Sequence, residues 1–255
     1  MSEATDAAMA RAGGDAADRN PKFTRIKPAS LADEVTERIV KAIAEGVLLP
    51  GERLIETRLA EQLHVSRVPV RDALRALEKQ GIVVVTPHRG ARVMEINLDL
   101  YRQVQEVRLD LELRAIADFM VRLRHEPELG DPLRARLAEM DEAVADDDRD
   151  RYNSLDVAFH RWICHSAQNH IVTTLWEALS RHLRILLGLM AEDWQVIGTS
   201  QADHKKLAGL IAAGNKEAIR GLMTHHLFQD IERVDYDPDI HRFTMNPSRR
   251  RHARG

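Results

Sequence analysis

The stretch VSRVPVRDALRALEKQG, residues 65–81, decides the fold because it predicts a short helix with two unlike flanks. One flank is apolar and carries, at helical spacing, Val70, Leu74 and Leu77. The neighbouring flank carries basic residues at i, i+4 spacing, namely Arg67, Arg71 and Arg75. We expect the apolar flank to anchor the helix in a small domain and the arginines to face outward, toward DNA.

The segments around this helix complete a known order of elements. Residues 31–46, LADEVTERIVKAIAEG, place an apolar side chain at every fourth position and stop at a glycine, and residues 56–63, ETRLAEQL, describe a second short helix. After the arginine helix, residues 82–94, IVVVTPHRGARVM, have two β-rich arms around PHRG, which predicts a hairpin. Helix, helix, tight turn, helix and hairpin are the order of a winged helix-turn-helix, which reads the major groove with its third helix.

Positive charge is concentrated on the same part of the chain. Residues 64–92 contain six arginines and lysines against two acidic residues, whereas residues 31–63 contain four against seven. Arginine suits a DNA-facing position because its planar guanidinium can hold guanine or a phosphate with two hydrogen bonds. The alternative is that these arginines only solvate a surface helix, but they fall where the motif requires them.

Composition limits the class of protein. The chain has 255 residues, of which 44% are hydrophobic and only 4% aromatic, which favours a mainly α protein with an aliphatic core. Its net charge of −3 means that any DNA-binding surface is a local patch. A single cysteine, Cys164, excludes an internal disulfide and a multi-cysteine zinc site. There is no apolar run of membrane-spanning length and no secretory signal, so we expect a cytoplasmic protein.

Four sections follow from these patterns. We predict a disordered tail at 1–29, a winged helix-turn-helix domain at 30–96, an all-α bundle at 97–235, and a second tail with a basic end at 236–255. Breaks in the helical pattern near HEPELGDP, ADDDRD, AQN, QVIGTS and AAGN imply six or seven helices in the bundle. The basic end either contacts DNA phosphates or is merely solvated.

Four residues of the second half form a candidate metal site. Asp156 and His160 are i, i+4 and project from one face of a helix, while His204 begins a helical pattern and His226 lies on an inward stripe. Taken singly, each histidine is an ordinary polar residue. Together, three imidazoles and one carboxylate are a usual ligand set for zinc, with nickel or manganese as alternatives.

The N-terminal half resembles the GntR-type transcription regulators, in particular through LAEQLHVSR, PVRDAL and the RG of the wing. Carried over position by position, the resemblance implies the following DNA contacts: Arg53, Ser66, Arg67, Val68, Arg71, His88, Arg89 and Gly90. Val68 departs from the threonine more often found there, so a hydroxyl contact is replaced by an apolar one that suits a thymine methyl.

The second half resembles the FCD ligand-binding domain of the FadR-like branch of that family, through EVRLDLELRAIA, DVAFH and DHKKLAGLIAAGNKEAIRGLMTHHL. The family's metal ligands correspond here to Asp156, His160, His204 and His226. His225 is adjacent to the last of these, but the inward stripe favours His226, and His165 and His182 stand outside the pattern. Arg108 matches an arginine that points toward the pocket, where it would clamp an organic acid; the alternative is an ion pair with Glu112, four residues later.

The resemblance implies a dimeric repressor that binds an inverted repeat in double-stranded DNA and responds to a small organic acid. A metal-sensing regulator is an alternative that the sequence leaves open. A metal-dependent hydrolase fused to a DNA-binding domain is disfavoured, because the chain has no H-E-x-x-H motif, no His-Asp dipeptide and no nucleophile beside a base. We therefore expect a regulator and not an enzyme.

Overall fold

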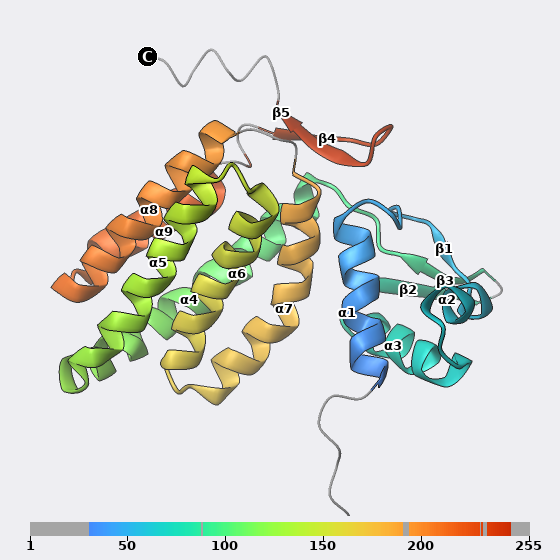
Figure 1. Ribbon diagram of the computed structural model, residues 1–255, viewed down its shortest axis with the longest axis horizontal. Coiled ribbons are helices and arrows are strands. Elements are labelled where there is room, and N and C mark those ends of the chain that lie inside the picture. Colours follow the sequence, from blue (N-terminus) through green and yellow to red (C-terminus); the bar gives the residue numbers. More distant parts are fainter. Residues whose placement is uncertain (1–30, 88, 191–193, 230, 232–233, 246–255) are drawn as a thin grey trace, which may run out of the picture. The chain divides into compact units, whose positions relative to one another are not determined.

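The computed structural model describes residues 31–87, 89–190, 194–229, 231 and 234–245. The tail expected at residues 1–29, the wing residue His88 and the last ten residues, 246–255, lie outside this part of the chain. The described part is mainly α, as the composition predicts, and begins with a winged helix-turn-helix (Figure 1).

The winged helix-turn-helix follows the predicted order. Its helices are α1 (Leu31–Ala44), α2 (Glu56–Leu63) and α3 (Arg67–Lys79), and its wing strands are β2 (Val83–Thr86) and β3 (Gly90–Val93). A further short strand, β1 (Arg53–Leu54), was not predicted; it pairs antiparallel with β3, giving a sheet of order β1-β3-β2. Two residues are too few to show the alternation of side chains from which a strand is predicted.

The turn between α2 and α3 fixes the start of the arginine helix. His64 ends α2 in the left-handed region, with a φ of 54°. Ser66 then takes the N-cap position of α3 in an extended conformation, although its side chain makes no capping hydrogen bond. Along α3 the predicted apolar flank is buried, and Gly81, with a φ of 77°, supplies the left-handed turn after the helix.

The rest of the described chain is built largely from helices: α4 (Leu98–His125), α5 (Gly130–Ala145), α6 (Arg149–Ser166), α7 (His170–Gly188), α8 (Trp194–Ala213) and α9 (Lys216–Phe228), with a 3-10 turn at Pro127–Leu129. Four of these helices start at a side-chain cap, in which a carboxylate or amide oxygen accepts from the third backbone amide of the helix; the caps are Asn97, Asp148, Asn169 and Asn215.

One predicted break is displaced by a few residues. The interruption lies between the end of α7 at Gly188 and the start of α8 at Trp194, and QVIGTS itself, residues 195–200, is helical. Gly198 does not end α8, because a single glycine inside a helix costs only about 1 kcal/mol relative to alanine, which the rest of a twenty-residue helix can offset. None of the described helices has both the length and the apolar character that a membrane span requires.

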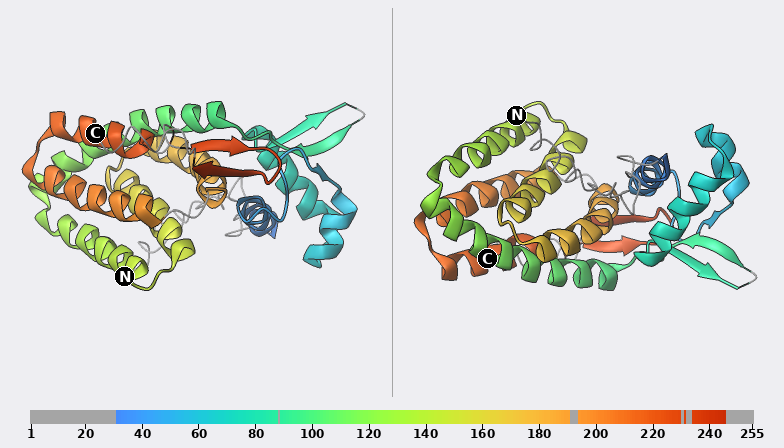
Figure 2. Two further views of the ribbon diagram at one scale, coloured as in Figure 1. Left: turned by 90° about the horizontal axis from the view of Figure 1, so that it is seen from above. Right: turned by 90° about the horizontal axis from the view of Figure 1, so that it is seen from below.

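The predicted C-terminal tail also needs correction. An antiparallel hairpin of β4 (Val234–Asp237) and β5 (Arg242–Met245) crosses its predicted start at residue 236. Phe243 is fully buried, and its ring lies 5.4 Å from that of Tyr101 and 5.2 Å from that of Tyr236. Val234 of β4 is buried in the same hydrophobic cluster, and the charged residues around these two apolar side chains concealed the hairpin. Figure 2 shows the hairpin beside the end of α7, where the amide of Phe243 donates to the carbonyl of Leu189.

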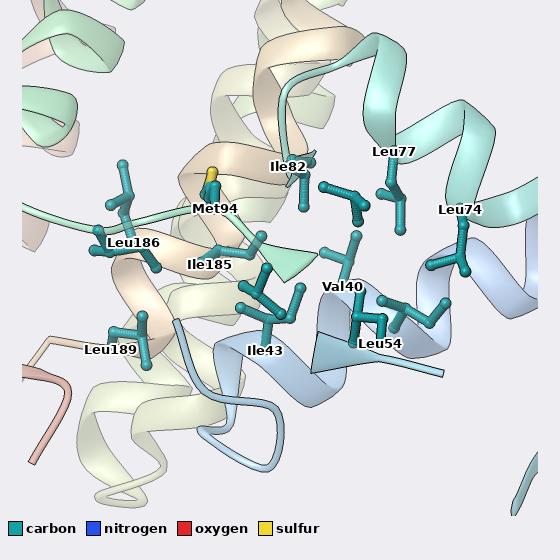
Figure 3. Packing of buried hydrophobic residues seen from close by; sticks show 14 of the residues in the cluster. Val40, Ile43, Leu54, Leu74, Leu77, Ile82, Met94, Ile185, Leu186 and Leu189 are labelled. Atoms are coloured by element: carbon teal, nitrogen blue, oxygen red, sulfur yellow. The ribbon is translucent and has the colours of Figure 1, made fainter. Parts of the chain in front are cut away.

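One hydrophobic cluster joins the winged domain to α7. Val40 and Ile43 of α1 and Leu74 and Leu77 of α3 belong to it, together with three residues from the end of α7 or just beyond it, Ile185, Leu186 and Leu189 (Figure 3). Two further clusters lie among the helices α4 to α9. The position of α1 is therefore set by packing against both α3 and α7.

Candidate metal centre and nucleic-acid interface

The arginines of α3 reach the surface as the sequence predicts. The side chains of Arg67 and Arg71 are 59% and 46% exposed, and Val68 between them is 64% exposed. Among the other residues expected to contact DNA, Arg53, Ser66 and Arg89 are exposed and Gly90 is half-buried. These residues are therefore accessible to a ligand, and only His88 lies outside the description.

The two arginines are held by an acidic residue that the sequence analysis missed. Glu56, the first residue of α2, accepts from Nη2 of Arg71 at 3.1 Å and from Nη2 of Arg67 at 3.3 Å. The hydrogen bond from Arg71 is the main reason why the pKa of Glu56 lies below its usual range. Glu56 is eleven residues before Arg67, so no local spacing indicates the contact.

The wing turn lies close to an arginine from β1. A Cβ atom added to Gly90 would lie 3.4 Å from Nε of Arg53, so the absence of a side chain leaves room for that guanidinium. Arg53 pairs with Arg92 in the register of β1 and β3, and Arg92 donates to the carbonyl of Gly51 at 2.8 Å. The sheet thus brings Arg53 beside the wing, although the two are far apart in the sequence.

The second candidate site is a buried cluster of Asp156 and His160 from α6, His204 from α8 and His226 from α9. Each offers one ligand atom, and these atoms lie within 4.8 Å of one another. Nε2 of His204 lies 3.0 Å from Nε2 of His160 and 3.1 Å from Oδ1 of Asp156. The four residues that the sequence singled out therefore converge, and the neighbouring His225 is exposed.

Each histidine of the cluster has an outer polar neighbour at Nδ1. Nδ1 of His160 lies 2.6 Å from Oε2 of Glu112, that of His204 lies 3.4 Å from the hydroxyl of Tyr152, and that of His226 lies 3.7 Å from Oδ2 of Asp203. Outer neighbours of this kind orient a metal-binding imidazole and fix which nitrogen carries the proton. With Nδ1 facing an outer neighbour in this way, Nε2 is the nitrogen available to an ion.

Burial also prepares the cluster electrostatically. It lowers the pKa of His160, His204 and His226, so these imidazoles are neutral near pH 7 and keep a lone pair for an ion. Burial acts to raise the pKa of Asp156, but the hydrogen bond with His204 and the positive charge of Arg108 hold it well below its ordinary value. Asp156 is therefore an anion.

These four residues fit a divalent ion. Neutral imidazoles and one carboxylate are a usual donor set for zinc, nickel or manganese. Donors bound about 2.0–2.2 Å from one ion lie at most about 4.4 Å apart, so a cluster within 4.8 Å needs only a small contraction.

Arg108 combines the two alternatives that the sequence left open. Its Nε donates to Oε1 of Glu112 at 2.7 Å, which is the expected ion pair. Its Nη2 lies 3.8 Å from Oδ2 of Asp156, beside the cluster, and is buried without a hydrogen-bond partner among the described residues. The ion pair thus uses one edge of the guanidinium and leaves a donor unused next to the candidate metal centre.

Glu112 has more partners than Arg108 alone, and these were not foreseen. Besides Arg108 and His160, it accepts from Nε1 of Trp176 at 3.0 Å. Burial acts to raise the pKa of Glu112, but Arg108 and His160 overcome that effect and hold it far below its usual range. The two other histidines set aside earlier stay outside the cluster: His165 is exposed and contacts Glu177, and His182 is half-buried on α7.

Two family models cover most of the chain. The model described as "Bacterial regulatory proteins, gntR family" matches residues 31–93, and the one described as "FCD domain" matches residues 103–229. The first of these models describes regulators, so the expectation of a regulator is confirmed and the enzyme alternative is set aside.

Relatives and solved structures agree with these matches. The chain is 30% identical over 189 residues to the Nta operon transcriptional regulator of Aminobacter aminovorans, which covers 72% of this chain and 85% of that one. It is 27% identical to a probable D-xylose utilization operon transcriptional repressor of Paenarthrobacter nicotinovorans, over 80% of this chain and 88% of that one. The structure of E. coli McbR/YncC superposes with a TM-score of 0.69 at 26% identity, covering 80% of this chain and 96% of that one. The chain therefore belongs to the GntR family of bacterial transcription regulators and carries an FCD domain.

Proposed function

We propose that this regulator is a dimeric, metabolite-responsive repressor in which a metal-containing pocket of the FCD domain controls the winged helix-turn-helix. In this proposal residues 30–96 form the domain that binds DNA. Residues 97–235 form the domain that binds the effector and a second copy of the chain. GntR regulators bind operator DNA and small-molecule effectors, typically as dimers. A two-fold protein requires an operator that is an inverted repeat.

The ligands of the proposed ion are Asp156, His160, His204 and His226. Support comes from the convergence of their donor atoms and from the neutral state that burial imposes on the imidazoles. An ion held by these residues would supply a Lewis-acidic position for a carboxylate oxygen. Zinc is the first choice for this donor set, with nickel and manganese as alternatives.

The proposed effector is a small organic acid, and the unused Nη2 of Arg108 is the observation that carries this assignment. A buried guanidinium nitrogen without a partner costs free energy, roughly 1–3 kcal/mol for a polar group, and a carboxylate would satisfy it. Its position beside Asp156 lets one acid contact both the ion and Arg108.

The DNA-binding part of the proposal uses the exposed residues of α3 and the wing. Arg67, Val68 and Arg71 would enter the major groove, and Arg53, Ser66 and the wing turn His88–Gly90 would contact the flanking backbone or minor groove. Support comes from the exposure of the described members of this set and from the excess of positive charge on residues 64–92.

The test has two arms. Elemental analysis of chelator-treated protein reloaded with zinc, nickel or manganese is expected to find about one ion per chain, and a panel of small carboxylic acids is expected to raise the Tm only when an ion is present and Arg108 is intact. Selection from random duplex DNA is expected to return an inverted repeat. If zinc alone, with no acid, changed binding to that repeat, the chain would be a metal sensor instead.

A further inference from the structure

One buried carboxylate joins three helices at the edge of the proposed metal centre. Glu112 of α4 is 1% exposed. Its Oε1 accepts from Nε of Arg108 and from Nε1 of Trp176 on α7, at 2.7 and 3.0 Å, and its Oε2 lies 2.6 Å from Nδ1 of His160 on α6. A displacement of His160 or Arg108 would therefore alter the position of the Glu112 carboxylate, to which Trp176 is hydrogen-bonded.

Helix α7 extends from this junction to the DNA-binding domain. Arg181 donates to Oε1 of Glu37 on α1 at 2.9 Å, and Arg184 forms a short hydrogen bond with Oε2 of the same carboxylate. One turn further, Gly188 lies against Ala44: a Cβ atom at Gly188 would be 2.6 Å from the carbonyl oxygen of Ala44. The C-terminal end of α7 is thus fixed to α1 by an ion pair and by close backbone contact.

Helix α1 in turn packs on the arginine helix. Val40 and Ile43 share a cluster with Leu74 and Leu77 of α3, and Figure 3 shows these side chains pointing toward one another. Close-packed side chains transmit displacement because they leave no room for independent movement. The contacts are therefore continuous from His160 to the helix that carries Arg67 and Arg71.

We propose that Glu112 is a positioning residue that couples occupancy of the pocket to α7, and that α7 passes the change to the DNA-binding domain through α1. The inference rests on the proposed metal centre, because an ion at His160 or an anion at Arg108 alters the groups that hold Glu112. Trp176 connects the pocket to α7, because its indole N–H donates a hydrogen bond to the carboxylate of Glu112.

The experiment compares Trp176→Phe with Trp162→Phe by hydrogen exchange, with and without Zn²⁺ as the probe. Trp176→Phe keeps an aromatic ring, removes the indole donor to Glu112 and places a smaller side chain at a buried position. Trp162, on α6, packs against Phe119 and is the matched control. In the wild type we expect Zn²⁺ to slow exchange at α6 and α8 and also, by about fivefold or more, at residues 31–44 of α1. Trp162→Phe should behave like the wild type, whereas Trp176→Phe should keep the slowing at α6 and α8 and lose it at α1.

The outcomes separate this inference from the proposed metal centre. Zn²⁺-dependent slowing at α1 that persists in Trp176→Phe, or that is absent from a wild type that binds Zn²⁺, would overturn the coupling and leave the metal centre intact. A wild type without slowing at α6 and α8 would overturn the metal centre and the coupling together. Should Trp176→Phe fail to fold, Glu112→Gln provides a second test, because it removes the negative charge that joins this residue to Arg108 and His160. At saturating Zn²⁺ the response at α1 should be lost, and the affinity for Zn²⁺ should fall about 10- to 100-fold.

Discussion

Oε2 of Glu56 lies 3.1 Å from Nη2 of Arg71, so the helix that precedes the proposed recognition helix already holds this guanidinium in the absence of DNA. Oε1 and Oε2 also accept from Nε of Arg71, both at 3.3 Å. The carboxylate thereby occupies one edge of the guanidinium and leaves the remaining donors for a ligand. Glu56 both orients Arg71 and reduces the positive charge near the start of α3.

These two effects of Glu56 predict that its removal changes the affinity for unrelated DNA and the preference for the operator in opposite directions. In Glu56→Gln we expect affinity for unrelated duplex DNA to rise, because a negative charge beside two arginines is removed. Discrimination between operator and unrelated DNA should fall, because Arg71 is no longer oriented. Glu61→Gln is the control, since it makes the same change on the exposed side of α2. Fluorescence anisotropy at one fixed salt concentration measures both; unchanged discrimination in Glu56→Gln would contradict a positioning role.

Arg71 itself should contribute to base recognition. We expect Arg71→Ala to weaken operator binding about 5- to 150-fold per half-site and to relax the preference at one base pair, as expected for a bidentate contact to a base. Lys79→Ala, at the C-terminal end of the same helix, should weaken binding to all sequences slightly and equally. Operator libraries varied at single positions distinguish the two; an unaltered base preference in Arg71→Ala would refute the assignment.

The sequence indicates the elements better than it indicates their contacts. The apolar and basic flanks of α3 follow from helical periodicity, and Asp156 and His160 follow from i, i+4 spacing, because both patterns are local. The convergence of the four side chains, in contrast, depends on how α6, α8 and α9 pack, which the family resemblance implied and spacing alone did not.

The features that were missed are long-range. The contact of Trp176 with Glu112 joins residues 64 positions apart, and that of Glu37 with Arg181 joins residues 144 positions apart. Phe243 was missed because the few apolar side chains of its segment, Val234 among them, are too widely spaced to show a periodicity. Each of these contacts arises from packing between elements, which cannot be read from one segment at a time.

His226 and His225 provide a matched pair for the metal centre. His226→Ala should reduce the zinc content and remove the rise in Tm that zinc produces, because it deletes a proposed ligand that is buried in the cluster. His225→Ala, on the exposed side of the same helix turn, should leave both unchanged. The measurements are elemental analysis and thermal unfolding with and without a chelator. Equal zinc content in both variants would place the ion elsewhere.

The stability of the metal-free protein should fall as the pH is lowered from about 6.5. Burial lowers the pKa of His160, His204 and His226 in the folded state, so only the unfolded chain takes up these protons just below pH 6.5. Each such histidine then costs up to about 1.4 kcal/mol per pH unit until its folded-state pKa is reached. Urea unfolding between pH 7.5 and 5.5 measures the slope, which should be shallower in His204→Gln than in the wild type. A wild-type stability that rose toward pH 5.5 would show the opposite sign and contradict the assignment.

Helices α7 and α1 approach each other so closely at Gly188 that one added methyl group should disturb their contact. In Gly188→Ala the new Cβ would lie 2.6 Å from the carbonyl oxygen of Ala44 and 2.8 Å from its Cβ, and backbone on one side cannot move without shifting α1. Overpacking of this kind costs about 1–3 kcal/mol of unfolding free energy. Gly221→Ala, inside α9 with no atom near the new Cβ, should instead stabilise the protein by about 0.5–1 kcal/mol through helix propensity. If α1 packs on α7 as described, denaturant unfolding should show a lower free energy of unfolding for Gly188→Ala and a higher one for Gly221→Ala. A stabilised Gly188→Ala would contradict the close contact between the two helices.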